Sequence, residues 1–80
     1  MMKPERWSDD KQEFIARTKA ARKASGYSQT EMARIFGIAQ DTWKQYETRT
    51  PLPHRYIPNF CTIAKVSETW LFTGKGRRAA

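Results

Sequence analysis

The sequence predicts an all-α protein, a compact bundle of five short helices in one domain. Apolar residues recur at helical spacings of three and four along most of the chain. Helix-starting Ser and Asp residues and helix-ending glycines divide this pattern into short segments. No stretch gives a convincing strand, and 80 residues leave room for one domain with a small core.

The first helix is expected from Asp9 to about Ala24. The sequence DDKQEFIARTKAARKA is rich in helix formers and lacks glycine and proline, and Ser8 or Asp9 serves as its N-cap. Gly26 then ends the helix in the left-handed conformation. The weakly apolar face of this helix consists of Phe14, Ile15, Thr18, Ala21 and Ala24.

The second and third helices are expected on either side of a single glycine, Gly37. Ser28 begins the second helix, and Glu31, three residues later, completes a capping box. The third helix runs from about Gln40 to Thr48. The residues expected to face the core are Met32, Ala33, Phe36, Ile38, Trp43, Tyr46 and Glu47. The third helix directs Gln40, Asp41, Lys44 and Gln45 outward.

The fourth and fifth helices follow an extended, proline-rich connector at 49–53. The fourth has an irregular first turn at 54–57 and begins properly at Pro58, because proline is favoured in a first turn. Ser67 caps the fifth helix, ETWLFT, and Gly74 ends it. The core residues of the fourth helix are Phe60, Cys61, Ile63 and Ala64.

The two ends of the chain are expected to lie outside the helical domain, which spans 9–74. Residues 1–8 are mostly polar and form a flexible N-terminal arm unless Trp7 packs on the domain. The basic C-terminal tail, 75–80, either follows a DNA backbone by charge attraction or is disordered without a specific role.

The two helices around Gly37 indicate a DNA-reading function. Helices joined by a short turn with a glycine cross steeply, so the first braces the backbone while the second enters a groove. The major groove of B-DNA admits a helix, and Gln, Asp and Lys side chains read base edges there. The charge agrees, because 15 basic and 8 acidic side chains give a net charge of +7 and favour polyanion binding.

Two stretches together resemble a known family. SGYSQTEMARIFGIAQDTWKQYE is similar to the helix-turn-helix core of the Cro and phage-repressor (XRE-like) DNA-binding domains. VSETWLFTG is similar to the V-S-x-x-W-L-x-T-G ending of the same family, so the resemblance covers about residues 14–74. It implies a lambda-repressor-like five-helix fold, binding to double-stranded DNA and dimerisation.

The resemblance assigns roles to individual positions. Base contacts fall on Gln40, Asp41 and Gln45, with Lys44 on the same exposed helix. Phosphate contacts fall on Gln29 and Thr42, and the charged side chains Arg34, Arg49 and Arg55 are further candidates. A structural salt bridge between the first and third helices falls on Arg22 and Glu47. The dimer interface falls on Trp70, Leu71 and Phe72, since one face of a short helix cannot bury all three.

Three positions depart from the family pattern. Ala39 stands where Ser or Thr usually caps the recognition helix, at a cost of about 1 kcal/mol. Trp43 replaces a smaller aliphatic residue and either needs extra room in the core or lies partly on the DNA side. Pro58 leaves the alignment of the fourth helix open and predicts a short one.

Other classes of function have little support in the sequence. His54 and Cys61 are seven residues apart, but Pro58 lies between them and no third ligand or orienting acid is evident, so no metal, cofactor or catalytic site is expected. No apolar run approaches the ~18–20 residues of a spanning helix, and the N-terminus lacks a signal-peptide core. A cytoplasmic location without membrane contact is therefore expected, and a single cysteine fits a reducing compartment.

The sequence thus predicts a sequence-specific transcriptional regulator of bacterial or phage origin that binds double-stranded DNA on the nucleoid. It is expected to be a repressor that binds a palindromic operator as a homodimer, and not an enzyme. The alternative is a protein-interaction module, such as an antitoxin or adaptor, that has the same fold and binds DNA weakly. In that case the apolar residues from Trp70 to Phe72 engage an unknown protein partner.

Overall fold

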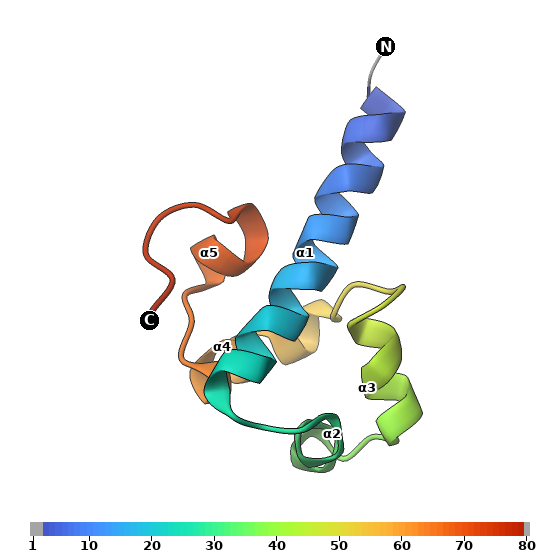
Figure 1. Ribbon diagram of the computed structural model, residues 1–80, viewed down its shortest axis with the longest axis vertical. Coiled ribbons are helices and arrows are strands. Elements are labelled where there is room, and N and C mark those ends of the chain that lie inside the picture. Colours follow the sequence, from blue (N-terminus) through green and yellow to red (C-terminus); the bar gives the residue numbers. More distant parts are fainter. Residues whose placement is uncertain (1–2, 80) are drawn as a thin grey trace.

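The protein is an all-α bundle, as the sequence predicts. The computed structural model describes the backbone of residues 3–79, with side chains from Lys11 onward. Within these residues no strand forms, and the only β-type pairing is an isolated bridge between Val66 and Ala79. The elements are α1 (Lys3–Ser25), α2 (Gln29–Phe36), α3 (Gln40–Tyr46), the 3₁₀-helix η1 (His54–Tyr56), α4 (Ile57–Ala64) and α5 (Glu68–Thr73) (Figure 1).

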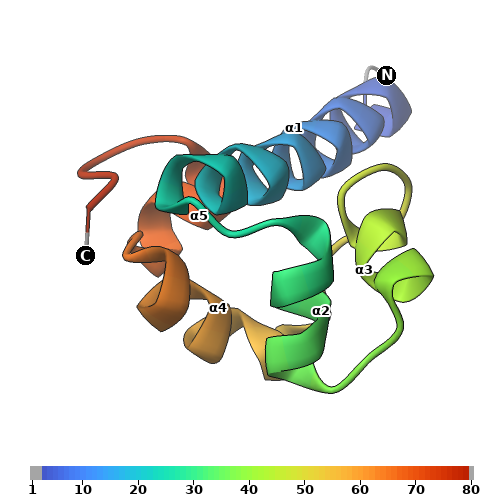
Figure 2. The same ribbon diagram turned by 60° about the horizontal axis from the view of Figure 1, so that its bottom comes forward.

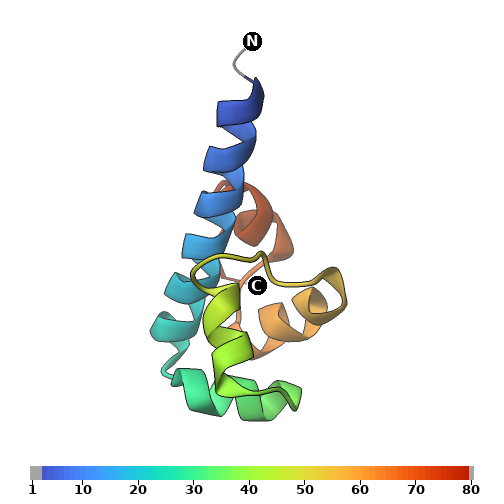
Figure 3. The same ribbon diagram turned by 90° about the vertical axis from the view of Figure 1, so that its right-hand side faces the viewer.

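The first helix begins earlier than expected. α1 starts at Lys3, so the predicted N-cap at Ser8 or Asp9 is wrong and residues 3–8 are helical. Pro4 does not prevent this, because the N–H groups of a first turn have no partner within the helix. Met1 and Met2 of the expected arm lie outside the described residues. The N-terminal half of α1 projects beyond the other helices (Figures 1 and 3).

The core lies where the second half of α1 meets the other helices. α1 packs against α4 and α5, and α2 packs against α3 (Figure 2). The expected inward face of α1 is buried, except that Ala24 is exposed. The largest fully buried side chains are Trp43, Phe60, Met32, Leu52 and Leu71. Leu52 comes from the connector, where proline content alone predicts only an extended chain.

The turns follow the predicted signals closely. Gly26, Gly37 and Gly74 all have positive φ at helix ends, and η1 is the expected irregular turn before α4. α4 begins at Ile57, one residue before the expected Pro58. Its end is closed by Lys65, a non-glycine residue with φ of 59°.

The last helix and the tail are tied to the bundle by contacts that the sequence pattern does not reveal. Arg17 of α1 donates from Nε and Nη2 to the carbonyl oxygens of Leu71 and Phe72, at 2.8 Å each. Ser67 Oγ accepts from the Trp70 N–H at 3.0 Å and donates to the carbonyl oxygen of Arg77 at 2.7 Å. The described part of the tail, up to Ala79, therefore folds back on α5.

None of the helices described between residues 3 and 79 combines the length and apolar character needed to cross a membrane.

Candidate nucleic-acid interface

The α2–turn–α3 unit is built by the predicted capping signals. The Glu31 N–H donates to Ser28 Oγ at 3.0 Å, and the Ser28 N–H donates to Glu31 Oε1 at 2.8 Å. Gly37 has φ of 69° and its N–H donates to the Arg34 carbonyl at 3.1 Å. A Cβ at Gly37 would meet no atom within 4 Å, so the positive φ, not space, favours glycine there. The chain turns sharply and α3 leaves α2 at a steep angle (Figures 1 and 3).

The outer face of α3 is polar and exposed. Gln40, Asp41, Lys44 and Gln45 are all exposed, whereas Thr42 is partly buried. An open depression of about 320 Å³ lies along this face, and its lining consists of Asp41, Lys44, Gln45, Thr48 and Arg49. The structure therefore brings three of the four predicted base-contacting residues together with one predicted phosphate contact. Gln40 does not line the depression.

The other predicted phosphate contacts have different surroundings. Arg34 is exposed in the last turn of α2. Arg55 is exposed on η1 and its guanidinium lies 4.9 Å from the centre of the Tyr56 ring. Gln29 is partly buried and donates from Nε2 to Glu47 Oε1 at 3.0 Å. Gln29 thus directs its amide N–H into the protein, while both arginines remain accessible.

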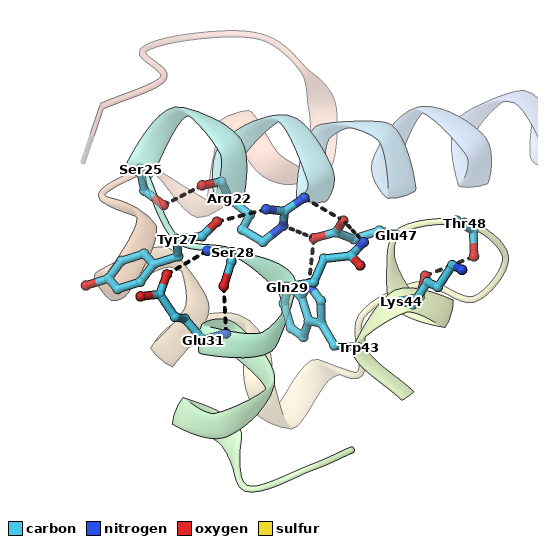
Figure 4. A network of polar contacts seen from close by, with 10 residues as sticks. All are labelled: Arg22, Ser25, Tyr27, Ser28, Gln29, Glu31, Trp43, Lys44, Glu47 and Thr48. Atoms are coloured by element: carbon cyan, nitrogen blue, oxygen red, sulfur yellow. Dashed lines mark hydrogen bonds and ion pairs between the residues drawn. The ribbon is translucent and has the colours of Figure 1, made fainter. Parts of the chain in front are cut away.

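A network of hydrogen bonds on the inner face of α3 converges on Glu47 (Figure 4). The Arg22 guanidinium donates from Nε to Oε2 at 2.5 Å and from Nη2 to Oε1 at 3.1 Å. The Trp43 indole donates to Oε2 at 2.6 Å. Arg22 also donates from Nη1 to the carbonyl oxygen of Tyr27 at 2.8 Å. The predicted Arg22–Glu47 bridge is confirmed, and both residues are buried.

The network controls the charge state of Glu47. Burial by itself raises the pKa of a carboxyl group, because it disfavours the charged form. Hydrogen bonds from Arg22, Gln29 and Trp43, together with the positive charge of Arg22, outweigh burial and lower the pKa of Glu47. Glu47 therefore stays ionised at neutral pH although it is only 4% exposed.

Two locations were open for Trp43, namely the core and the DNA-facing side of α3, and the structure shows that it lies in the core. Its side chain is fully buried and does not lie on the outer face of α3. The ring stacks on Phe36 with the centroids 5.7 Å apart and lies 5.7 Å from the Phe60 ring centroid. The extra room that a tryptophan needs is therefore present in the core.

The predicted dimer interface needs a correction. Leu71 is fully buried in the core of its own chain, so its assignment to a subunit interface is wrong. A short helix turns its residues by about 100° each, and this turns Leu71 inward between its two neighbours. Trp70 is partly buried beneath the Arg78 guanidinium, 5.1 Å from its ring centroid. Phe72 is 44% exposed and stacks on Phe14 at 5.5 Å.

The residues considered for metal binding or catalysis have different surroundings. No group of three or more potential metal ligands forms within the part of the chain that the structure describes. Cys61 is buried in α4, whereas His54 is exposed on η1 beside Phe72, with ring centroids 6.0 Å apart. Burial, together with the charge of Glu68, raises the pKa of the Cys61 thiol to about 11. Such a thiol is protonated at neutral pH and is a poor nucleophile.

The chain matches no protein-family model, and comparisons with curated proteins and with solved structures found no match. What the surface binds is therefore inferred from its own residues.

Sequence reasoning missed two of the contacts that hold α3. The Trp43–Glu47 bond could have been found, because positions i and i+4 lie on the same side of a helix. The Gln29–Glu47 bond joins residues 18 apart, and no local pattern indicates it. Arg17 caps α5 by donating to the carbonyl oxygen of Leu71, 54 residues away. No pattern in the sequence indicates this contact.

Proposed function

We propose that the protein is a sequence-specific transcriptional regulator of the XRE-like class that reads double-stranded DNA with α3. The observation that carries this proposal is the division of α3 into two faces. Its inner face is held by a fully hydrogen-bonded network, while its outer face offers exposed amide, carboxylate and ammonium groups. A helix that only covers the core more often carries Glu and Lys pairs four residues apart on its outer face, and α3 has none.

The exposed groups suit base recognition in the major groove. The amides of Gln40 and Gln45 can pair with adenine, and the Lys44 ammonium can donate to guanine. The Asp41 carboxylate can accept from the N4 amino group of cytosine, which is the base-edge donor that suits it. Arg34, Arg49 and Arg55 are exposed and would bind phosphates, which set the register and affinity of the complex.

The regulator is proposed to act as a homodimer on a palindromic operator, on DNA in the cytoplasm of a bacterium. Phe72, exposed beside Phe14, and the partly covered Trp70 are the candidate contact residues on each chain. In a two-fold dimer the recognition helices bind half-sites about 34 Å apart, one turn of DNA. Occupation of a promoter by such a dimer represses transcription without a further domain.

Selection of duplexes from a random DNA pool at near-physiological salt tests the proposal. A palindromic motif with half-sites about 10 base pairs apart is the expected outcome. The selection is then repeated with Gln40→Ala and Gln45→Ala. Each variant should lose the sequence preference at one base position and bind the operator more weakly by about 1–3 kcal/mol. Thr62→Ala, an exposed change on α4, is the matched control and should leave the motif intact.

A protein-interaction module is the second candidate, and the exposed Phe72 is the observation that favours it. In this case the random pool gives no enriched motif, although the basic chain still binds duplex DNA in a salt-sensitive way. Phe72→Ser should then abolish binding to a protein partner and leave DNA binding unchanged. The two candidates therefore give opposite results in the same selection.

A further inference from the structure

The carboxylate of Glu47 joins three helices. Glu47 is the C-cap residue of α3, and its two oxygens accept hydrogen bonds from Arg22 on α1, Gln29 on α2 and Trp43 on α3. An ionised carboxylate has about four acceptor positions, and these four bonds occupy them. Every buried side-chain nitrogen and oxygen among the described side chains has a partner, so the network is complete. The end of the recognition helix is thus fixed to both of its neighbours.

The Trp43 side chain links α3 to α2 and α4. Its ring stacks on Phe36 of α2, with 5° between the ring planes, and packs against Phe60 of α4. Its indole N–H meets the carboxylate one turn further along α3. A rotation of α3 would break this hydrogen bond and the ring stacking together. The same rotation would move Gln40 and Lys44, which lie on either side of Trp43 in sequence.

Gln29 links the start of α2 to the end of α3. It is the first residue of α2, and its Nε2 lies 3.0 Å from Glu47 at the far end of α3. One of the two N–H groups of the Gln29 amide is therefore used inside the protein. This contact differs from the phosphate-binding role that the resemblance implied.

We propose that Trp43 and Gln29 are positioning residues, which hold Glu47 and thereby set the orientation in which α3 presents its outer face to DNA. The proposal rests on the DNA-reading function proposed above. In this proposal the positive charge of Arg22 and the hydrogen bonds from the two neutral donors have separate roles. Arg22 from α1 is the charged group that faces Glu47, while α2 and α3 contribute the neutral donors. Loss of either neutral donor leaves the ion pair in place but releases α3.

The test compares Trp43→Phe and Gln29→Ala with Val66→Ala. Trp43→Phe keeps an aromatic ring and removes the indole N–H, and Gln29→Ala removes the partly buried amide that donates to Glu47. Val66→Ala is the matched control, because it removes buried packing between α4 and α5 and keeps all four hydrogen bonds. Each variant is first checked for helix content and melting temperature. Affinity is then measured for the selected operator and for a scrambled duplex, over a range of salt concentrations.

Trp43→Phe and Gln29→Ala should each lower the preference for the operator over the scrambled duplex by about tenfold, the effect of one charge-assisted hydrogen bond. The slope of log affinity against log salt should not change, because no phosphate contact is lost. Val66→Ala should melt at a lower temperature and keep the preference of the parent protein. If Gln29 binds phosphate instead, Gln29→Ala lowers the salt slope by about one and weakens both duplexes equally. That result overturns its positioning role.

A second readout does not depend on DNA. The titration of the Glu47 carboxyl carbon by NMR should show a higher pKa in Trp43→Phe and Gln29→Ala than in the parent, and α3 amides should exchange faster. Val66→Ala should leave the titration unchanged. If the parent protein prefers no duplex, the proposed function fails, and this readout alone decides whether Trp43 and Gln29 hold α3. If it prefers its operator and neither variant changes the preference or the titration, the positioning proposal fails by itself.

Discussion

At the scale of single residues, the buried pair Arg22 and Glu47 makes the fold sensitive to the loss of either partner. Replacing Arg22 by Met leaves a buried carboxylate without its charged partner, and we expect a loss of about 3–5 kcal/mol in the free energy of unfolding at pH 7. Urea denaturation measures it. The control is Lys23→Met, an exposed change on the same helix, which should alter stability by less than about 0.5 kcal/mol.

The stability lost in Arg22→Met should depend on pH. The pKa of Glu47 is lower in the folded protein than in the unfolded chain, so its stabilising contribution is present above the ordinary pKa of glutamate. The contribution is lost as the pH falls through the lowered folded value. The difference in stability between the parent and Arg22→Met should therefore shrink in acid. A difference that stays constant from pH 7 to pH 3 would contradict the lowered pKa.

Lys65 is a second residue with a measurable effect on stability, because its backbone conformation is unfavourable. Its φ of 59° places it in the left-handed region, where a Cβ is unfavourable by roughly 1 kcal/mol. Lys65→Gly should raise the free energy of unfolding by about 0.5–1 kcal/mol, because glycine adopts this conformation without strain. Lys65→Ala removes the charge but keeps the Cβ, and should not stabilise the protein. Thermal unfolding of the two variants separates the effects of backbone and charge.

At the scale of elements, the missing cap of α3 offers a direct test. Ala39 is the N-cap and makes no side-chain hydrogen bond, although its φ and ψ are those of a normal cap. Ala39→Ser should stabilise the protein by about 1 kcal/mol, as a serine hydroxyl can accept from a free N–H of the first turn. Ala20→Ser, at an exposed position inside α1, should instead destabilise by a few tenths of a kcal/mol. Equal effects at both positions would show that α3 needs no cap.

Most element boundaries could be predicted from the sequence because capping is local. The capping box of α2, the Ser67 cap of α5 and the left-handed glycines are confirmed. The start of α1 was not predictable in this way, because nothing between Pro4 and Ser25 forbids a helix and several residues resemble caps. Charged and polar residues at Ser8 and Asp9 are compatible with either a cap or a helix interior, so local signals do not decide between them.

At the scale of the whole molecule, the net charge of +7 predicts salt dependence of the proposed DNA binding. Four of the eight acidic residues lie in the first 13 positions, and the remaining positions carry 12 basic and 4 acidic side chains. The logarithm of the affinity should fall by about 0.9 per phosphate contact for each tenfold rise in salt. Arg49→Ala should reduce this slope by about one, and Lys19→Ala, an exposed change of equal charge on α1, should not. Titrations at several salt concentrations measure both slopes.

The candidate interface could be predicted in part. The outward direction of Gln40, Asp41, Lys44 and Gln45 follows from the helical period and is confirmed. The depression that joins this face to Arg49 depends on the path of the chain after α3. That path is set by a turn in which the carbonyl oxygen of Gln45 accepts from the N–H groups of residues 48 to 50, which no periodic pattern describes.

The sequence by itself determined the helical class, the order of the helices, most of their caps and the polar face of α3, because each depends on residues within one or two helical turns. Only the tertiary structure decided that Gln29 donates to Glu47, that Leu71 is buried while Phe72 is exposed, and that Arg17 caps α5. These contacts join residues 18 or 54 positions apart. Their geometry depends on how the helices pack, and side-chain packing is a property of the whole bundle.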